Sequence, residues 1–113
     1  MTRTEIESVL EGTGLPYEYY KFDEGSGIQP PFLVWYLPSQ SGFYADNVTY
    51  VSFRSLVIEL YTDEKDFSVE SAVEAALEGA GLTFSWEETY LPEEMMYEKI
   101  YQMEVIWDEC ERE

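Results

Sequence analysis

Apolar and polar residues alternate along this chain with two different periods, and each period predicts one kind of element. In residues 4–11, Ile6, Val9 and Leu10 recur at the three- and four-residue spacings of one helix face. Residues 68–80 repeat that spacing with the apolar side chains Val69, Val73, Ala76, Leu77 and Ala80. The two stretches predict amphipathic helices that bury their apolar stripes against another element.

Short polar and glycine signals mark the ends of both predicted helices. Thr4 and Glu7 have the Thr-x-x-Glu spacing of a capping box, and Gly12, Gly14 and Pro16 follow the first helix as stop signals. Either Asp66 or Ser68 can cap the second helix, and Gly81 suits the left-handed residue after its C-terminus.

Five stretches have the pattern of strands. Residues 17–22 are aromatic or long-chained, and residues 32–37 form an unbroken apolar run, which is typical of a strand buried on both faces. Residues 48–62 are rich in β-formers and far exceed the usual strand length of roughly 5–6 residues, so we expect part of this strand to project beyond the sheet. Residues 82–87 and 97–107 alternate with period two, and their short connection predicts antiparallel pairing.

The resulting order, α-β-β-β-α-β-β, predicts a single α+β domain spanning residues 1–113. We expect two layers, with two helices on one face of a mixed or mostly antiparallel sheet of about five strands. Residues 39–47 are predicted to be a loop, and the charged residues 108–113 a frayed tail.

The predicted loop and the start of the long strand form a candidate contact surface. They carry aromatic residues in a polar setting, and the stretch has the character of an arm that reaches a neighbouring copy. The candidate interface residues are Phe43, Tyr44, Asp46, Asn47 and Tyr50.

Charge narrows the range of partners. The chain has 24 acidic and 6 basic residues and a formal charge of −18, while 17% aromatic content argues for a packed core rather than an acidic disordered tail. Basic residues occur only singly, so the sequence predicts neither specific nucleic-acid binding nor binding to an acidic membrane. Two positive uses of the charge remain: imitation of a phosphate backbone, or a surface past which nucleic acid slides.

Signals for catalysis are missing from the sequence. It contains no histidine, no P-loop and no Gly-x-Ser-x-Gly, and its single cysteine, Cys110, lies between two glutamates that disfavour a reactive thiolate. We therefore predict a protein that is not an enzyme and that has no cofactor or metal site.

One acidic stripe is a candidate for a channel lining. Glu70, Glu74 and Glu78 recur every four residues and share one face of the second predicted helix. The stripe faces either the bore of an assembly or only solvent, and the sequence leaves both open.

Several motifs resemble the small minor structural proteins of long-tailed bacteriophages and prophages. The similarity covers residues 15–106 and is closest to tail terminator, tail completion and head–tail joining proteins. The motifs are Gly14-Leu-Pro-Tyr17, Pro30-Pro-Phe-Leu-Val-Trp-Tyr36, Tyr44-Ala-Asp-Asn-Val-x-Tyr50 and Val57-x-Glu-Leu-Tyr-Thr-x-x-Lys-Asp66.

This resemblance implies a virion protein at the tail end near the head, assembled in the host bacterial cytoplasm. Such proteins have an α+β fold and form a ring, commonly a hexamer, which caps the tail tube protein and meets the head–tail connector protein. Six copies of this chain would carry about 108 negative charges, and those lining the bore would repel passing DNA. The alternative is an acidic DNA mimic that inhibits a host DNA-binding protein or nuclease.

Overall fold

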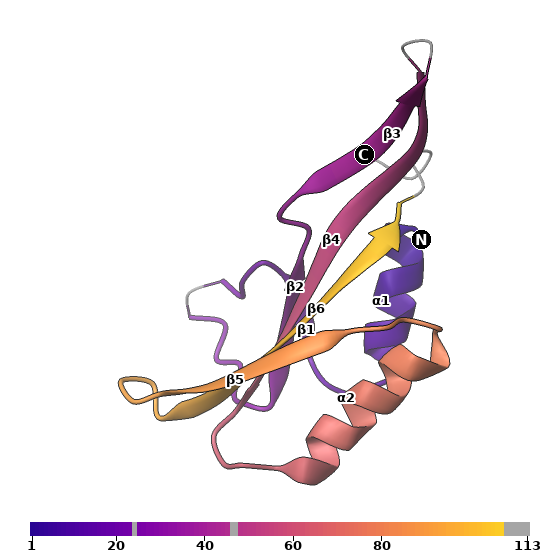
Figure 1. Cartoon of the computed structure of the whole chain (residues 1–113). Coiled ribbons are helices and arrows are strands. Elements are labelled where there is room, and N and C mark those ends of the chain that lie inside the picture. Colours follow the sequence, from indigo (N-terminus) through magenta and orange to yellow (C-terminus); the bar gives the residue numbers. More distant parts are fainter. Residues whose placement is uncertain (24, 46–47, 108–113) are drawn as a thin grey trace.

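The computed structural model of this protein describes residues 1–23, 25–45 and 48–107, and for residues 41–45 and 48–52 it describes the backbone only. It contains two helices and a mixed sheet, which confirms the predicted α+β class (Figure 1). In chain order the elements are α1 (Arg3–Glu11), β1 (Tyr17–Tyr19), β2 (Phe32–Tyr36), β3 (Gln40–Ala45), β4 (Val48–Thr62), α2 (Phe67–Gly79), β5 (Ser85–Leu91) and β6 (Met96–Ile106).

The main path of the sheet runs β1-β2-β4-β6-β5 and contains the five strands expected from the sequence. Strands β1 and β2 are parallel, and the other neighbours are antiparallel. Strand β4 lies at the centre, where residues 57–61 pair with β2 and residues 53–62 pair with β6. Strand β3 lies off this path and pairs only with β4, so it adds a strand without changing the predicted order of the rest.

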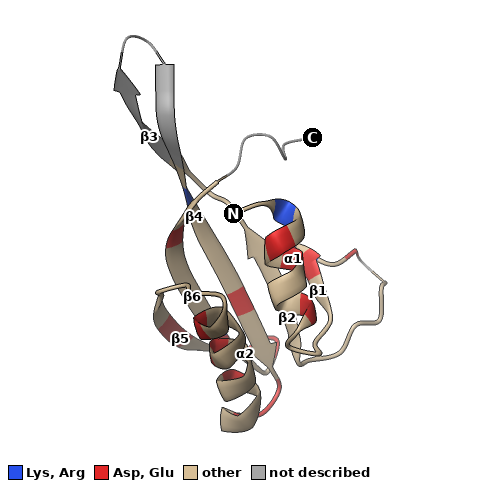
Figure 2. Ribbon diagram, turned by 90° about the vertical axis from the view of Figure 1, so that its right-hand side faces the viewer, with Lys and Arg blue, Asp and Glu red and all other residues tan. Residues whose placement is uncertain are grey.

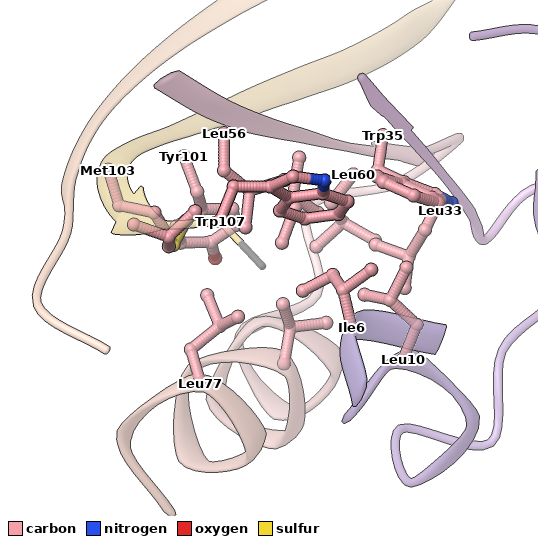
Figure 3. Packing of buried hydrophobic residues seen from close by; sticks show 13 residues of the cluster. Ile6, Leu10, Leu33, Trp35, Leu56, Leu60, Leu77, Tyr101, Met103 and Trp107 are labelled. Carbon is pink, nitrogen blue, oxygen red and sulfur yellow. The ribbon is translucent and has the colours of Figure 1, made fainter. Parts of the chain in front are cut away.

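Both helices pack on the same face of the sheet, as predicted, and the core lies between the two layers (Figures 1 and 2). Figure 3 shows Ile6, Leu10 and Leu77 pointing from the helices toward the sheet. The sheet residues that they meet are fully or almost fully buried: Leu33, Trp35, Leu56, Ile58, Leu60 and Tyr101. A two-layer core of this kind buries one face of the sheet and leaves the other free of helices.

Helix α1 begins at Arg3, one residue before the predicted start, and its N-cap lies two residues before the predicted one. Its capping box consists of Thr2 and Glu5, in which the Glu5 amide donates to the Thr2 hydroxyl and the Thr2 amide donates to the Glu5 carboxylate. Thr4 and Glu7 have the same spacing but lie inside the helix, so the predicted cap was wrong. The earlier start lets Met1 pack against the core and brings its amino group to the Ile106 carbonyl oxygen.

The ends of α2 follow the predicted signals. Of the two candidate caps, Asp66 is the one used, and its carboxylate accepts from the Val69 amide. Gly81 has φ +78°, the left-handed conformation that was predicted. The Gly81 amide donates to the Glu78 carbonyl oxygen, and the Leu82 amide donates to the Leu77 carbonyl oxygen. These two bonds are those of a Schellman motif, which requires a residue such as glycine in the left-handed conformation.

Several strand limits differ from the prediction. Residues 40–45 were expected in a loop but form β3, because backbone pairing with β4 does not depend on apolar side chains. Strand β1 ends at Tyr19, since Tyr20 has φ +69° and cannot continue an extended strand. Strand β5 begins at Ser85, while Leu82 and Phe84 pack against the core before the strand starts.

A matched pair of isoleucines tests the assignment of the core. Ile58 is fully buried at the centre of β4, whereas Ile106 at the end of β6 is 59% exposed. We expect Ile58→Ala to lower the free energy of unfolding by about 2–5 kcal/mol, because the truncation leaves a cavity. Ile106→Ala should lower it by about 0.5 kcal/mol or less. Urea unfolding of both variants measures the difference, and equal losses would contradict the described packing.

Candidate interaction surfaces

Strands β3 and β4 form a two-stranded ribbon that extends beyond the rest of the sheet (Figure 1). Residues 48–52 of β4 pair with β3, whereas the pairing of β4 with β6 begins only at Phe53. The molecule is correspondingly elongated, with principal extents of 51 × 29 × 24 Å. A two-stranded ribbon in water is at best marginally stable, so this projection has the geometry of an arm that needs a partner surface.

Three of the five candidate interface residues lie within this ribbon. Phe43 and Tyr44 are on β3, on either side of a shift in register, and Tyr50 is on β4. Their side chains lie outside the described part of the chain, as do Asp46 and Asn47 altogether. The backbone therefore places Phe43, Tyr44 and Tyr50 together on one projecting element, as the predicted arm required, although residues 40–45 form a strand and not the predicted loop.

The base of the ribbon is fixed by contacts on both strands. The Ser55 amide donates to the Ser39 carbonyl oxygen over 3.1 Å, and the two serine hydroxyl oxygens are 2.9 Å apart. The Arg54 guanidinium lies 5.7 Å from the centroid of the Trp107 ring. These contacts anchor the point at which the ribbon leaves the core.

The predicted acidic stripe on α2 is not one exposed surface. Glu70 is 6% exposed, and its carboxylate contacts Lys65 at 2.6 Å and Lys99 at 3.1 Å. Glu74 is half-buried and contacts the Lys99 Nζ at 2.8 Å. Only Glu78 is exposed, so Glu70 and Glu74 cannot line a bore as free carboxylates. The spacing of the glutamates could not predict this burial, because it depends on Lys99 of β6, which lies beneath this face of the helix.

Electrostatics within this cluster favours the ionised forms. Burial alone would raise the pKa of the Glu74 carboxyl, but hydrogen bonds from Lys99 and Tyr101 outweigh burial and hold the pKa below its ordinary value. Burial would lower the pKa of Lys99, but its contacts with Glu74 and Glu70 raise the pKa instead. The Lys99 Nζ also lies 4.1 Å from the centroid of the Trp86 ring. The cluster therefore ties α2 to β5 and β6.

Removal of Lys99 tests this tie. We expect Lys99→Met to lower the free energy of unfolding by about 3 kcal/mol at pH 7, because the buried Glu70 and the half-buried Glu74 both lose a cationic partner. The exposed Lys21→Met is the matched control and should cost about 0.5 kcal/mol or less. Urea unfolding at several pH values measures both.

The pH dependence of that loss has a defined sign. Because the pKa of Glu74 is depressed in the folded protein, its contribution is present above the unfolded pKa and disappears as the pH falls through the folded value. The difference between Lys99→Met and the parent should therefore shrink below about pH 4. A difference that stays constant well below that pH would contradict the described pairing.

The helix-free face of the sheet carries a second polar cluster. The hydroxyls of Tyr36 and Tyr61 lie 2.6 and 2.7 Å from the two carboxylate oxygens of Glu59. The Tyr61 hydroxyl also lies 2.7 Å from Glu98 on β6. The Phe32 ring stacks on Tyr61 with centroids 5.1 Å apart, so the cluster is bordered by aromatic rings.

The two carboxylates of this cluster compete for one donor. The Tyr61 hydroxyl has one hydrogen, so it cannot make a full hydrogen bond to Glu59 and to Glu98 at the same time, and the two acids repel each other across it. Burial, and then the neighbouring Glu59 carboxylate, raise the pKa of Glu98 despite the hydrogen bond from Tyr61. Burial and the two carboxylates raise the pKa of Tyr61 as well. The one sequence signal for the cluster was Glu59, an acid within the otherwise apolar residues 56–61.

Neutralisation of Glu98 tests the repulsion between the two acids. A raised pKa means that the stabilising contribution is complete below the unfolded pKa and is lost as the pH rises through the folded value. Glu98→Gln removes that loss, so we expect it to raise stability at pH 8 by about 0.5–1 kcal/mol, the range for a relieved cross-strand repulsion. The gain should be smaller at pH 5. Glu104→Gln, an exposed site on the same strand, should show no such difference between the two pH values.

The outer edge of the sheet at β5 is unusually open. All of its residues except Leu91 are exposed, including Trp86 at 52% and Tyr90 at 46%. Beside it is a hollow of about 340 Å³ lined by Asp63, Glu64, Lys65, Tyr90 and Tyr97. The alternating pattern of residues 82–87 had predicted this strand but not its exposure.

Within the described residues, no group of three or more histidine, cysteine or acidic side chains is placed to hold a metal ion. No helix in that part of the chain is both long and apolar enough to cross a membrane. The chain matches no protein-family model and no curated protein. Function is therefore inferred from the surfaces described above.

Proposed function

We propose that this protein is a non-enzymatic virion subunit of a long-tailed bacteriophage or prophage. In this proposal, copies assemble as a ring, with a hexamer as the expected form, that closes the tail tube and joins it to the head connector. The observation that carries the proposal is the β3–β4 ribbon, which projects from the core with no second layer of its own among the described residues. The resemblance of the sequence motifs to those of tail terminator proteins gives the proposal its setting.

The ribbon supports a ring because it is a long contact element on a small body. A head-to-tail contact, in which the arm of one copy lies on the body of the next, generates a closed ring when the rotation between copies is right. Each ribbon would then gain the partner surface that two strands need for stability. The half-buried groove of about 510 Å³ on the helix-free face, lined in part by Tyr36, Pro38 and Val57, is one surface that such an arm could occupy.

The charge supports a bore through which DNA passes. Acidic residues occur on both helices and on several strands (Figure 2), and the net charge of −18 gives each copy a strong negative field. Exposed carboxylates such as Glu78 would supply the repulsion within the ring. Salt at ~0.15 M screens this field beyond roughly 8 Å, so only carboxylates near the passing DNA contribute.

The partners of several carboxylates weaken the case for a DNA mimic. A mimic needs free carboxylates spaced like phosphates along one convex face. In the described residues Glu70, Glu74 and Glu88 are held in ion pairs, and Glu59 and Glu98 in hydrogen bonds with tyrosines. The geometry therefore favours the ring over the mimic.

Shortening the ribbon tests the proposal. Ser41 and Phe53 are register partners, so an Asn-Gly turn can join them in place of residues 42–52 without changing the rest of the sheet. We expect the full chain to form rings in electron micrographs and a defined oligomer by sedimentation at high micromolar concentration. The shortened chain should remain monomeric, because the arm is missing.

Thermal unfolding supplies the control for this experiment. The shortened chain should keep the midpoint of the parent monomer within a few degrees, since all the core residues that the structure describes lie outside residues 42–52. Rings that persist without the ribbon would contradict the arm. A full chain that stays monomeric at every concentration and binds a basic DNA-binding protein would favour the mimic instead.

A further inference from the structure

We infer that the outer edge of β5 binds an extended, arginine-bearing segment of another protein. The segment would add a strand to the sheet, and one of its guanidinium groups would occupy the hollow beside Tyr90. This inference is independent of the proposed ring, because it concerns a different surface and a foreign partner.

The backbone of β5 offers the first part of the site. Strand β5 pairs with β6 along its whole length, and in the described residues no strand pairs with its other side. The exposed side chains from Ser85 to Tyr90 show that no helix or loop in that part of the chain covers this edge. An uncovered edge presents amide and carbonyl groups that an extended peptide can pair with.

The hollow offers the second part. Tyr90 and Tyr97, cross-strand partners, form one wall, with ring centroids 4.9 Å apart and planes at 64°. Asp63 and Glu64, from the turn between β4 and α2, contribute two exposed carboxylates to the lining. Aromatic faces and carboxylates together favour a cationic side chain, and the planar guanidinium of arginine both stacks on rings and bonds carboxylates.

Lys65 also lines the hollow, but its positive charge does not repel a cationic side chain that binds there. Its Nζ lies 2.6 Å from Glu70 and 2.6 Å from Glu88, so two carboxylates compensate its charge. Burial alone would lower the pKa of Lys65, but these hydrogen bonds raise it. Around the edge, Glu87, Glu93 and Glu94 are exposed and add to the negative field. The complementary segment is therefore basic.

A second copy of this chain fits the edge poorly. The protein carries −18, so like charges oppose the approach of another β5 with its own Glu87 and Glu88. Only six basic residues are present in the chain, and the cationic groups of Lys65 and Lys99 are already held in ion pairs. A basic strand of a different protein meets neither obstacle.

Peptide binding to the full-length protein tests the inference. The probe is a capped octapeptide of alternating arginine and threonine, and its control has glutamine in place of each arginine. Titration is followed by calorimetry and by amide chemical shifts. We expect the arginine peptide to bind more tightly than the glutamine peptide, with shifts concentrated in Ser85–Leu91 and residues 63–65.

Variants distinguish a site from general attraction to an acidic protein. The double variant Asp63→Asn/Glu64→Gln should weaken binding about five-fold or more, from the loss of two ion pairs. Glu78→Gln/Glu104→Gln removes the same charge from exposed positions elsewhere and should weaken binding less than two-fold, that is, by less than about 0.4 kcal/mol. Tyr90→Leu keeps apolar bulk but removes the ring, and should also weaken binding.

Four results would overturn the inference. They are equal binding of the glutamine peptide, equal losses from the two double variants, shifts centred away from β5, and concentration-dependent shifts of the free protein in β5, which would assign the edge to a second copy. None of these results bears on ring formation through the ribbon, so the two proposals fail separately.

Discussion

Strand β4 is the constraint on which the rest of the structure depends. It runs without interruption from Val48 to Thr62 and pairs with β2, β3 and β6. Its alternate residues Leu56, Ile58 and Leu60 form the floor on which both helices pack. Because one strand joins the core, the centre of the sheet and the ribbon, the direction in which the ribbon projects is set by the packed core rather than by a separate hinge.

The two faces of the sheet solve the burial of polar groups differently. Under α2, the cations of Lys65 and Lys99 compensate glutamates from the helix and from β5, so a surface rich in acid becomes partly neutral where it is buried. On the opposite face no cation is present among the described contacts of Glu59 and Glu98, and hydrogen bonds donated by tyrosine hydroxyls serve instead. Both arrangements follow from a chain with few basic residues, in which each buried carboxylate still needs a partner.

The surfaces left over divide between two kinds of contact. The ribbon is suited to a neighbouring copy, because it is long and stands clear of the acidic body. The β5 edge, with its aromatic and acidic hollow, is suited to a basic segment from elsewhere. In the two proposals, one surface serves self-assembly and the other receives a foreign strand, and these are the two contacts that a joining subunit requires.

The sequence by itself determined the class of fold, the order of the main elements and the apolar stripes with which the helices pack on the sheet. It could do so because periods of 3.6 and 2 residues are properties of local backbone geometry. It also indicated that the strand beginning at Val48 is too long for the sheet, and that Gly81 ends the second helix. Only the tertiary structure decided that Glu70 is buried on Lys99, that Tyr61 joins Glu59 to Glu98, and that β5 is an open edge. Those outcomes depend on which strands become neighbours. Contacts between residues far apart in the chain cannot be predicted from the spacing of apolar residues within one element.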